Sequence, residues 1–215
     1  MEVKRDYYLD KLISRKDNGL IKIITGIRRC GKSYLLFELY GGYLLKAGVP
    51  ESDIIKLSLD DAANARYRNP LELDKYIRGL VSGRTSNCYV FLDEIQFVKD
   101  IKNPWLPESN EKIGFVDVVL GLMKLPHTDI YITGSNSRML SSDIVTQFRD
   151  KGDEIRVHPF SYSEACRAHG GDSEETWREY YTYGGMPRLT ALSDRKSKVD
   201  YLTGLFENTY LKDVL

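Results

Sequence analysis

The sequence has few cysteines, no net charge and no long apolar run. Its three cysteines, Cys30, Cys88 and Cys166, are odd in number and stand far apart. The paired spacing of zinc sites and disulfide frameworks is therefore missing, and we expect a reducing compartment. Lysine and arginine number 31, against 31 for aspartate and glutamate. A balanced chain has no global basic field typical of nucleic-acid binding, although a local basic patch stays open.

Membrane and export signals are also missing from the sequence. No apolar stretch approaches the roughly 18 residues that a helix needs to cross a bilayer. The first eight residues, Met-Glu-Val-Lys-Arg-Asp-Tyr-Tyr, lack the apolar core of a signal peptide. These absences predict a cytoplasmic protein with no membrane partner. The 215 residues, of which 42% are apolar, suffice for one α/β core and a smaller appendage.

Short apolar runs rich in β-branched residues alternate with helical stretches along the chain. This is the pattern of a parallel sheet with crossover helices, and it predicts the α/β class. We expect strands at 21–25, 54–59, 88–93, 130–133 and 154–158. Helices are expected at 6–14, 33–46, 70–82, 113–125 and 141–148. Prolines and polar residues predict a long surface loop at 97–112, where Trp105 is either a partner or substrate contact or a plug folded over the core.

After the fifth expected strand the composition becomes helical. Ser161 and Glu164 form a capping box that opens a helix, and further helices are expected at 172–183 and 194–210. The pattern is still helical at residue 215, so we expect the native protein to be longer. We divide the chain into an α/β core at 1–160 and a helical region at 161–215 that starts a C-terminal part.

Residues 26–33 read Gly-Ile-Arg-Arg-Cys-Gly-Lys-Ser, a complete GxxxxGK[ST] sequence between an expected strand and an expected helix. Strand, glycine turn and helix start direct backbone N–H groups and the positive end of a helix dipole at one point, which predicts a nucleoside triphosphate site. Arg28 and Arg29 would meet phosphate or a partner, or be solvated. Cys30 is either an oxidisable thiol of lowered pKa or a small residue tolerated in the loop. The residues expected around the nucleotide are Gly26, Ile27, Arg28, Arg29, Cys30, Gly31, Lys32, Ser33 and Tyr34.

Charged and hydroxyl side chains near this loop predict the chemistry. Lys32 should reach the β- and γ-phosphates, and the Ser33 hydroxyl should be a ligand of Mg²⁺. Asp93 ends an apolar strand at the sheet edge beside the loop, where it would hold the metal. Glu94 is the candidate general base or water-positioning group for attack of water on the γ-phosphate. This acidic pair favours hydrolysis over transfer to a small metabolite, which needs no base aimed at water.

Asn136 and Arg149 complete the predicted catalytic set. Asn136 follows the strand at 130–133 and would hydrogen-bond phosphate or water, or else cap the next helix. Arg149 is the candidate arginine finger, acting in its own site or a neighbour's, or else a surface arginine paired with a nearby acid. Asp60 and Asp61 close the second strand and would sense nucleotide or face solvent. Three histidines lack metal-ligand spacing and are interpreted as structural: His127, His158 and His169.

These residues resemble a widespread family of predicted AAA+ ATPases in bacteria and archaea. The resemblance covers essentially the whole chain and rests on the blocks IITGIRRCGKS, LDEIQ, ITGSNS, FRDKGDEI, PFSYSE and YGGMPR. It implies a P-loop NTPase core whose five-stranded, mainly parallel sheet has the order 5-1-4-3-2, followed by a helical region and a nuclease-like C-terminal domain. The family's finger block usually reads Arg-Gly-Arg. Here it is Arg149-Asp150-Lys151, so only Arg149 carries over.

Two functions follow as expectations. The first is an ATP-binding, Mg²⁺-dependent ATPase core that couples hydrolysis to a downstream domain or partner. The alternative is a nucleotide-dependent signalling switch or scaffold with little turnover. ATP is preferred because the Asn-Lys-x-Asp signature of guanine readers is missing. The partners left open are the C-terminal domain of the same chain, a second copy of the chain, DNA and another protein.

Overall fold

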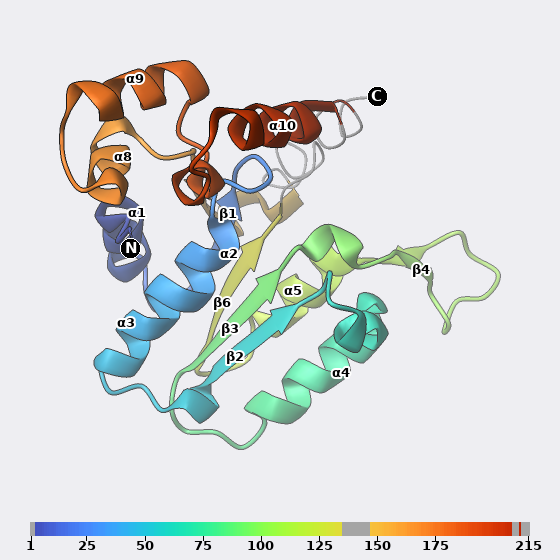
Figure 1. Ribbon diagram of the computed structural model, residues 1–215. Helices are drawn as coiled ribbons and strands as arrows, with labels where there is room; N and C mark the ends of the chain where they lie inside the picture. The colour runs from blue at the N-terminus through green and yellow to red at the C-terminus, as the bar shows by residue number, and fades with distance from the viewer. Residues whose placement is uncertain (1–2, 135–146, 208–210, 212–215) are drawn as a thin grey trace.

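Five parallel strands form the central sheet of the structure, a computed structural model that describes residues 3–134, 147–207 and 211. The order is β2-β3-β6-β1-β7 (Figure 1). Read from β7 and counting only the strands of this sheet, it is the expected order 5-1-4-3-2. All four neighbouring pairs are parallel. The strands are β1 (Ile21–Thr25), β2 (Ile54–Ser58), β3 (Cys88–Asp93), β6 (Thr128–Thr133) and β7 (Gly152–Arg156).

Helices cover both faces of this sheet, because successive side chains of a strand point to opposite sides. One face packs against α4 (Pro70–Val81) and α5 (Phe115–Leu122) through aliphatic side chains. The other packs against α1 (Asp6–Ser14) and a helical stretch at 32–46, and Phe91 and Tyr131 make it aromatic. The expected α/β architecture is therefore confirmed.

The helical stretch after β1 is continuous but changes its winding. It consists of α2 (Lys32–Tyr34), the π-helix η1 (Leu35–Tyr40) and α3 (Gly41–Lys46). The sequence predicts one regular helix at 33–46, because the wider turn leaves no mark in apolar spacing. The π turns end at Tyr40, whose buried hydroxyl lies 2.5 Å from the hydroxyl of Tyr131.

A buried ion pair lies near the starts of the central strands. Lys22 is 0% exposed, and its ammonium donates to Asp129 and to the Leu20 carbonyl at 3.0 Å. Asp129 also accepts hydrogen bonds from the Tyr131 hydroxyl at 2.7 Å and the Asp17 N–H at 2.9 Å. Each charge in this pair is thus neutralised by its neighbour.

Four helical segments gather over the end of the sheet where β1 stops (Figure 1). The expected capping box is present, with the Ser161 N–H donating to Glu164 Oε2 at 2.8 Å. Gly185 lies so close to the strand exit that a Cβ there would come within 2.0 Å of the Phe160 carbonyl oxygen. The segments are α8 (Tyr162–His169), α9 (Glu174–Tyr183), the 3-10 helix η6 (Pro187–Ala191) and α10 (Arg195–Leu205).

The expected loop at 97–112 is in part a projecting hairpin, which corrects the sequence interpretation. β4 (Ile101–Lys102) and β5 (Lys112–Ile113) pair antiparallel, and the hairpin extends away from the core (Figure 1). Because β5 uses residue 113, α5 starts only at Phe115, where Asp117 caps the Gly114 N–H at 2.8 Å. Trp105 is 71% exposed, so the plug interpretation is wrong.

Strand and helix ends differ from the expectations by a few residues. β7 begins at Gly152 rather than at 154, because its pairing with β1 starts at the register Ile21–Gly152. The expected helix at 141–148 lies almost entirely outside the described residues. Within the described part of the chain, no helix has both the length and the apolar character needed to cross a membrane.

Candidate nucleotide site

The loop after β1 has the backbone conformation that its glycines allow. Gly26 has φ 148° and Gly31 has φ 96°, values that side chains with a Cβ rarely adopt. A Cβ on Gly26 would lie 2.2 Å from the carbonyl oxygen of Val157, so close packing of the loop against the exit of β7 also requires glycine. Arg29, at the loop apex, has φ 65°.

Lys32 is folded back against this loop. The side chain is 4% exposed, and its ammonium donates to the carbonyls of Gly26 at 3.0 Å and Ile27 at 3.1 Å. No ion pair joins Lys32 to an acidic side chain in the part of the chain that the structure describes. The positive charge is therefore buried beside neutral groups only.

Asp93, at the end of β3, meets the loop. Its Oδ1 accepts hydrogen bonds from the Ser33 hydroxyl at 3.0 Å and from the Thr133 hydroxyl, and Ser58 Oγ lies 3.4 Å from its Oδ2. Burial raises the pKa of Asp93 above its ordinary value, and the hydrogen bonds from Thr133 and Ser33 oppose this rise. The nearby charge of Glu94 raises that pKa further.

This cluster has the donor chemistry that Mg²⁺ requires. Mg²⁺ binds oxygen ligands, and Ser33 and Asp93 offer a hydroxyl and a carboxylate at hydrogen-bond distance from each other. The carboxylate is 3% exposed and has only hydroxyl partners, so no cation within the described residues compensates its charge. Ser33 and Asp93 therefore fit the metal role expected from the sequence.

Glu94 follows directly in a left-handed conformation, with φ 54°, which is uncommon for a residue with a side chain. Its N–H donates to Thr133 Oγ1 at 3.2 Å, and its carboxylate accepts a hydrogen bond from the Gln96 amide. Thr133 thus contacts both acidic residues. Strained backbone of this kind often occurs at functional sites.

Sequence reasoning missed Thr133, Ser58 and Gln96. The sheet register contains a usable signal, because Leu92 lies opposite Ile132 and the next residues of both strands are therefore neighbours. The residue after Leu92 is Asp93 and the residue after Ile132 is Thr133, so the parallel register places the Thr133 side chain beside Asp93.

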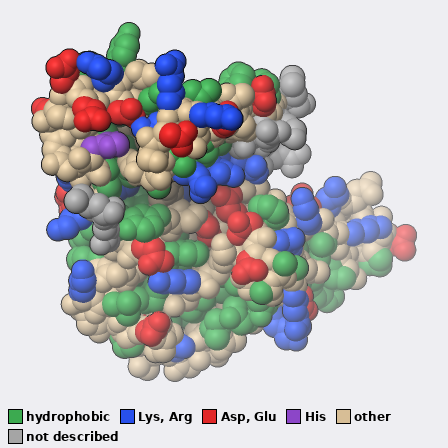
Figure 2. Space-filling model, in the orientation of Figure 1, with side chains coloured by type: hydrophobic (Ala, Val, Ile, Leu, Met, Phe, Trp, Pro, Cys, Tyr) green, Lys and Arg blue, Asp and Glu red, His purple; other side chains and the backbone are tan. Residues whose placement is uncertain are grey.

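Other loop residues contact the helical region. Ile27 packs against the buried cluster formed by Met186, Leu189 and Leu205. Burial raises the pKa of Tyr201, and the positive charges of nearby Arg29 and Arg188 lower it, so Arg29 lies beside the helical region. In Figure 2, basic side chains gather where this region meets the core, with acidic side chains beside them.

Cys30 is fully buried, which removes the oxidisable-thiol interpretation. Burial raises the pKa of its thiol, and the charges of Lys32 and Arg5 offset this only in part. The Sγ atom lies 3.5 Å from the Val157 carbonyl oxygen. Cys30 therefore acts as a small packing residue under the loop.

The remaining predicted residues are placed less completely. Asn136 lies outside the described residues, and of Arg149 only the backbone is described, in a 3-10 helix at Arg149–Lys151. Both stay predictions. Asp60 and Asp61 are exposed; Asp60 accepts from Ser58 Oγ at 2.8 Å, and Asp61 caps the Ala63 N–H at 2.9 Å. Tyr34 is 43% exposed.

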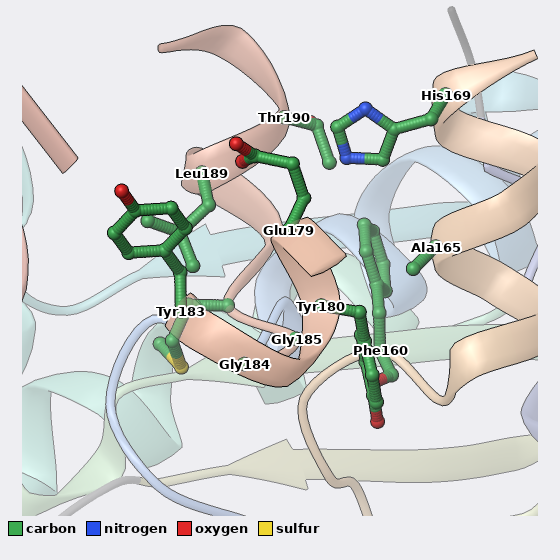
Figure 3. A pocket seen from close by; sticks show the side chains of 11 residues that line it. Phe160, Ala165, His169, Glu179, Tyr180, Tyr183, Gly184, Gly185, Leu189 and Thr190 are labelled. Atoms are coloured by element: carbon green, nitrogen blue, oxygen red, sulfur yellow. The ribbon is translucent and has the colours of Figure 1, made fainter. Parts of the chain in front are cut away.

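The helical region contains a separate small cavity (Figure 3). Its volume of 20 Å³ accommodates about one water molecule, so it is far too small for a nucleotide. Among the described residues, no group of three or more histidine, cysteine, aspartate or glutamate side chains could hold a metal ion. The cavity is lined by Phe160, Ala165, His169, Glu179, Tyr180, Tyr183, Gly184, Gly185, Met186, Leu189 and Thr190.

Comparison with known sequences gives a family. The sequence model of the family described as "AAA domain" matches residues 18–166. An uncharacterized protein of Haemophilus influenzae is 31% identical over 217 residues, which cover 99% of this chain and 50% of that protein. An uncharacterized protein of Methanocaldococcus jannaschii is 25% identical over 225 residues, which cover 99% and 45%. The chain spans about half the length of these curated relatives.

Two solved structures share the fold. The Caenorhabditis elegans PCH-2 structure aligns with a TM-score of 0.50 and 13% identity, covering 89% of this chain and 48% of that one. Saccharomyces cerevisiae Hsp104, in an extended complex with casein, aligns with a TM-score of 0.51 and 14% identity, covering 84% and 30%. The chain belongs to the AAA domain family of AAA+ ATPases and has a P-loop NTPase fold.

Proposed function

We propose that this chain is an ATP-binding, Mg²⁺-dependent ATPase core. The observation that carries the proposal is the 3.0 Å contact between Ser33 and Asp93, next to the buried ammonium of Lys32, which has only carbonyl partners among the described residues. A triphosphate with its metal ion supplies the negative and positive charges that Lys32 and Asp93 lack. Buried charges without an oppositely charged partner are costly unless a ligand compensates them.

Each residue then has a defined task. Lys32 exchanges its loop carbonyls for phosphate oxygens, and the loop N–H groups bind the phosphate chain. Ser33 and Asp93 would hold Mg²⁺, which when bound would neutralise charge on the β- and γ-phosphates. Glu94 takes the proton of the attacking water, and Thr133 fixes the Glu94 backbone. Asn136 and Arg149 are proposed to assist as water ligand and arginine finger.

A nucleotide switch with little turnover is the second candidate, and the Gln96 contact favours it. Gln96 donates a hydrogen bond to Oε2 of Glu94, and a carboxylate stabilised by such a bond is a weaker base for the proton of water. This contact would keep basal hydrolysis slow until a partner moves Gln96. The proposed partners are a C-terminal domain, a second copy, DNA or another protein, and the proposed setting is the cytoplasm.

Phosphate release from ATP tests both candidates. The wild-type chain and Glu94→Gln are compared with and without DNA. Glu94→Gln should keep ATP binding and lower phosphate release by about 10²–10⁴-fold, the usual contribution of a general base. Equal release from wild type and Glu94→Gln would remove Glu94 from the mechanism. Binding without release in every form would leave the switch as the function.

A further inference from the structure

We propose that Arg5 is a positioning residue that orients the phosphate loop and ties it to the helical region. This inference rests on the proposed nucleotide site and adds a residue that precedes the family match at 18–166. Arg5 is 1% exposed, although arginine is seldom fully buried without partners. It caps α1 in a left-handed conformation, with φ 47°.

The guanidinium of Arg5 joins three distant segments. Nη1 donates to the Cys30 carbonyl in the phosphate loop at 2.8 Å. Nη2 donates to the His158 carbonyl after β7 at 2.6 Å, and Nε donates to Glu164 Oε1 in α8 at 3.0 Å. Because a guanidinium is a rigid planar fork, its three donors fix these segments relative to one another.

Two aromatic rings hold the fork in place. The Arg5 Cζ atom lies 4.6 Å from the ring centroid of Tyr8 and 5.3 Å from that of Phe160. Phe160 in turn donates its N–H to the Gly185 carbonyl at 2.7 Å. A lysine ammonium matches neither the stacking nor the three-way donation, so lysine is not a conservative replacement here.

The contact with Cys30 has a direct consequence for phosphate binding. The described chain has no cis peptide bonds, so the N–H of Gly31 points away from the Cys30 carbonyl of the same planar unit. By holding that carbonyl, Arg5 turns the Gly31 N–H to the opposite side. The Gly31 N–H is one of the loop donors that the proposed site uses, so Arg5 acts through the loop without touching the nucleotide.

The contact with Glu164 extends this effect to the helical region. One carboxylate oxygen of Glu164 accepts from Arg5, and the other accepts from the Ser161 N–H at the start of α8. A movement of the Cys30–Gly31 peptide on nucleotide binding is therefore transmitted through Arg5 to the first turn of α8. We expect nucleotide to slow hydrogen exchange in that turn.

Nucleotide affinity and hydrogen exchange test the inference on the full chain. The variants are Arg5→Lys, Arg5→Ala and Glu164→Gln. Arg15→Ala is the matched control, since Arg15 directly follows α1 and pairs with Asp153 at 2.8 Å near the surface. All are measured well below their melting temperatures, by calorimetry with MgATP and by exchange of residues 162–166.

Arg5→Lys should bind MgATP about 10–100-fold more weakly, as expected for loss of a charged hydrogen bond, and should lose the nucleotide-induced protection of α8. Glu164→Gln should lose that protection with a smaller change in affinity, and Arg15→Ala should match wild type in both. If Arg5→Ala does not fold, Arg5→Lys decides. Wild-type affinity and protection in Arg5→Lys would overturn the inference alone. Failure of wild type to bind nucleotide would overturn the proposed function and, with it, this inference.

Discussion

The two ends of the central sheet each bury a lysine and an aspartate, but the two charges form an ion pair at only one end among the described residues. Near the strand starts, Lys22 and Asp129 form a direct ion pair, completed by the Tyr131 hydroxyl. At the opposite end, Lys32 has only carbonyl partners and Asp93 only hydroxyl partners among the described residues. Both ends are buried, so exposure does not explain the difference.

The contrast separates a structural ion pair from a candidate binding site. A buried pair satisfies its own charges, and breaking it leaves one charge uncompensated. A lysine and an aspartate that are both buried but not paired reduce stability, and both charges remain available for a ligand. The folded chain thus loses stability at one end of the sheet, and a bound nucleotide would restore it.

The largest effect is expected when the Lys22–Asp129 ion pair is broken. Lys22→Met leaves Asp129 buried without its cation and should lower the free energy of unfolding by about 3–5 kcal/mol. Denaturant unfolding measures this. Affinity for MgATP, scaled to the folded fraction, should not change. Replacing both partners, in Lys22→Met with Asp129→Asn, should recover most of the lost stability; no recovery would show that the pair is not the source of the loss.

The next largest effect is expected when Lys32 is replaced. Lys32→Met should weaken ATP binding by about 100-fold or more, because a buried charged contact to phosphate is lost. Its melting temperature without nucleotide should equal or exceed that of wild type. A drop in stability comparable to that of Lys22→Met would contradict the distinction between the two ends.

A smaller effect concerns Asp93 and pH. Burial raises the pKa of Asp93 in the folded state above its ordinary value of 3.8. The free energy of unfolding therefore falls as the pH rises from 3.8 through the folded-state pKa, because the buried carboxyl loses its proton. Without Mg²⁺, Asp93→Asn should be more stable than wild type by roughly 1–3 kcal/mol at neutral pH. The difference should shrink as the pH falls and both forms become neutral. Thermal unfolding across pH measures it.

Asp61→Asn is the matched control for Asp93→Asn. Asp61 is an exposed helix cap, and asparagine caps equally well, so stability should not change. Mg²⁺-dependent ATP binding should be lost only in Asp93→Asn. If the gain in stability of Asp93→Asn did not depend on pH, it would come from packing and not from charge.

The smallest effect is expected at the hairpin tip. Trp105 is 71% exposed, so Trp105→Ala should change the free energy of unfolding by less than about 0.5 kcal/mol. ATP affinity should equal that of wild type. A larger change in denaturant unfolding would mean that the hairpin packs against the core.

The sequence predicts those parts of the molecule whose signals are local. The loop at 26–33, the strand that ends at Asp93 and the capping box at Ser161 all combine residue type with spacing inside one short segment. Strand alternation was enough to predict the sheet. The hairpin was missed because two-residue strands, here on either side of Pro104 and Pro107, carry no periodic signal.

Other features depend on tertiary contacts that no local pattern contains. Arg5 reaches a partner 159 positions away, and the raised pKa of the Cys30 thiol follows from burial that the loop sequence does not indicate. Thr133 joins the site only through the register of β3 and β6. Sequence spacing therefore identifies the charged residues of the site, and the sheet register identifies the hydroxyls that surround them.

Calorimetric titration of ATP into the chain, with and without Mg²⁺, tests the central claim most directly. One site per chain is expected, with affinity that rises when Mg²⁺ is present and falls in both Lys32→Met and Asp93→Asn, whereas Lys22→Met binds as wild type. No heat of binding at millimolar ATP, or equal affinity in wild type and Lys32→Met, would contradict a nucleotide site between the loop and the end of β3.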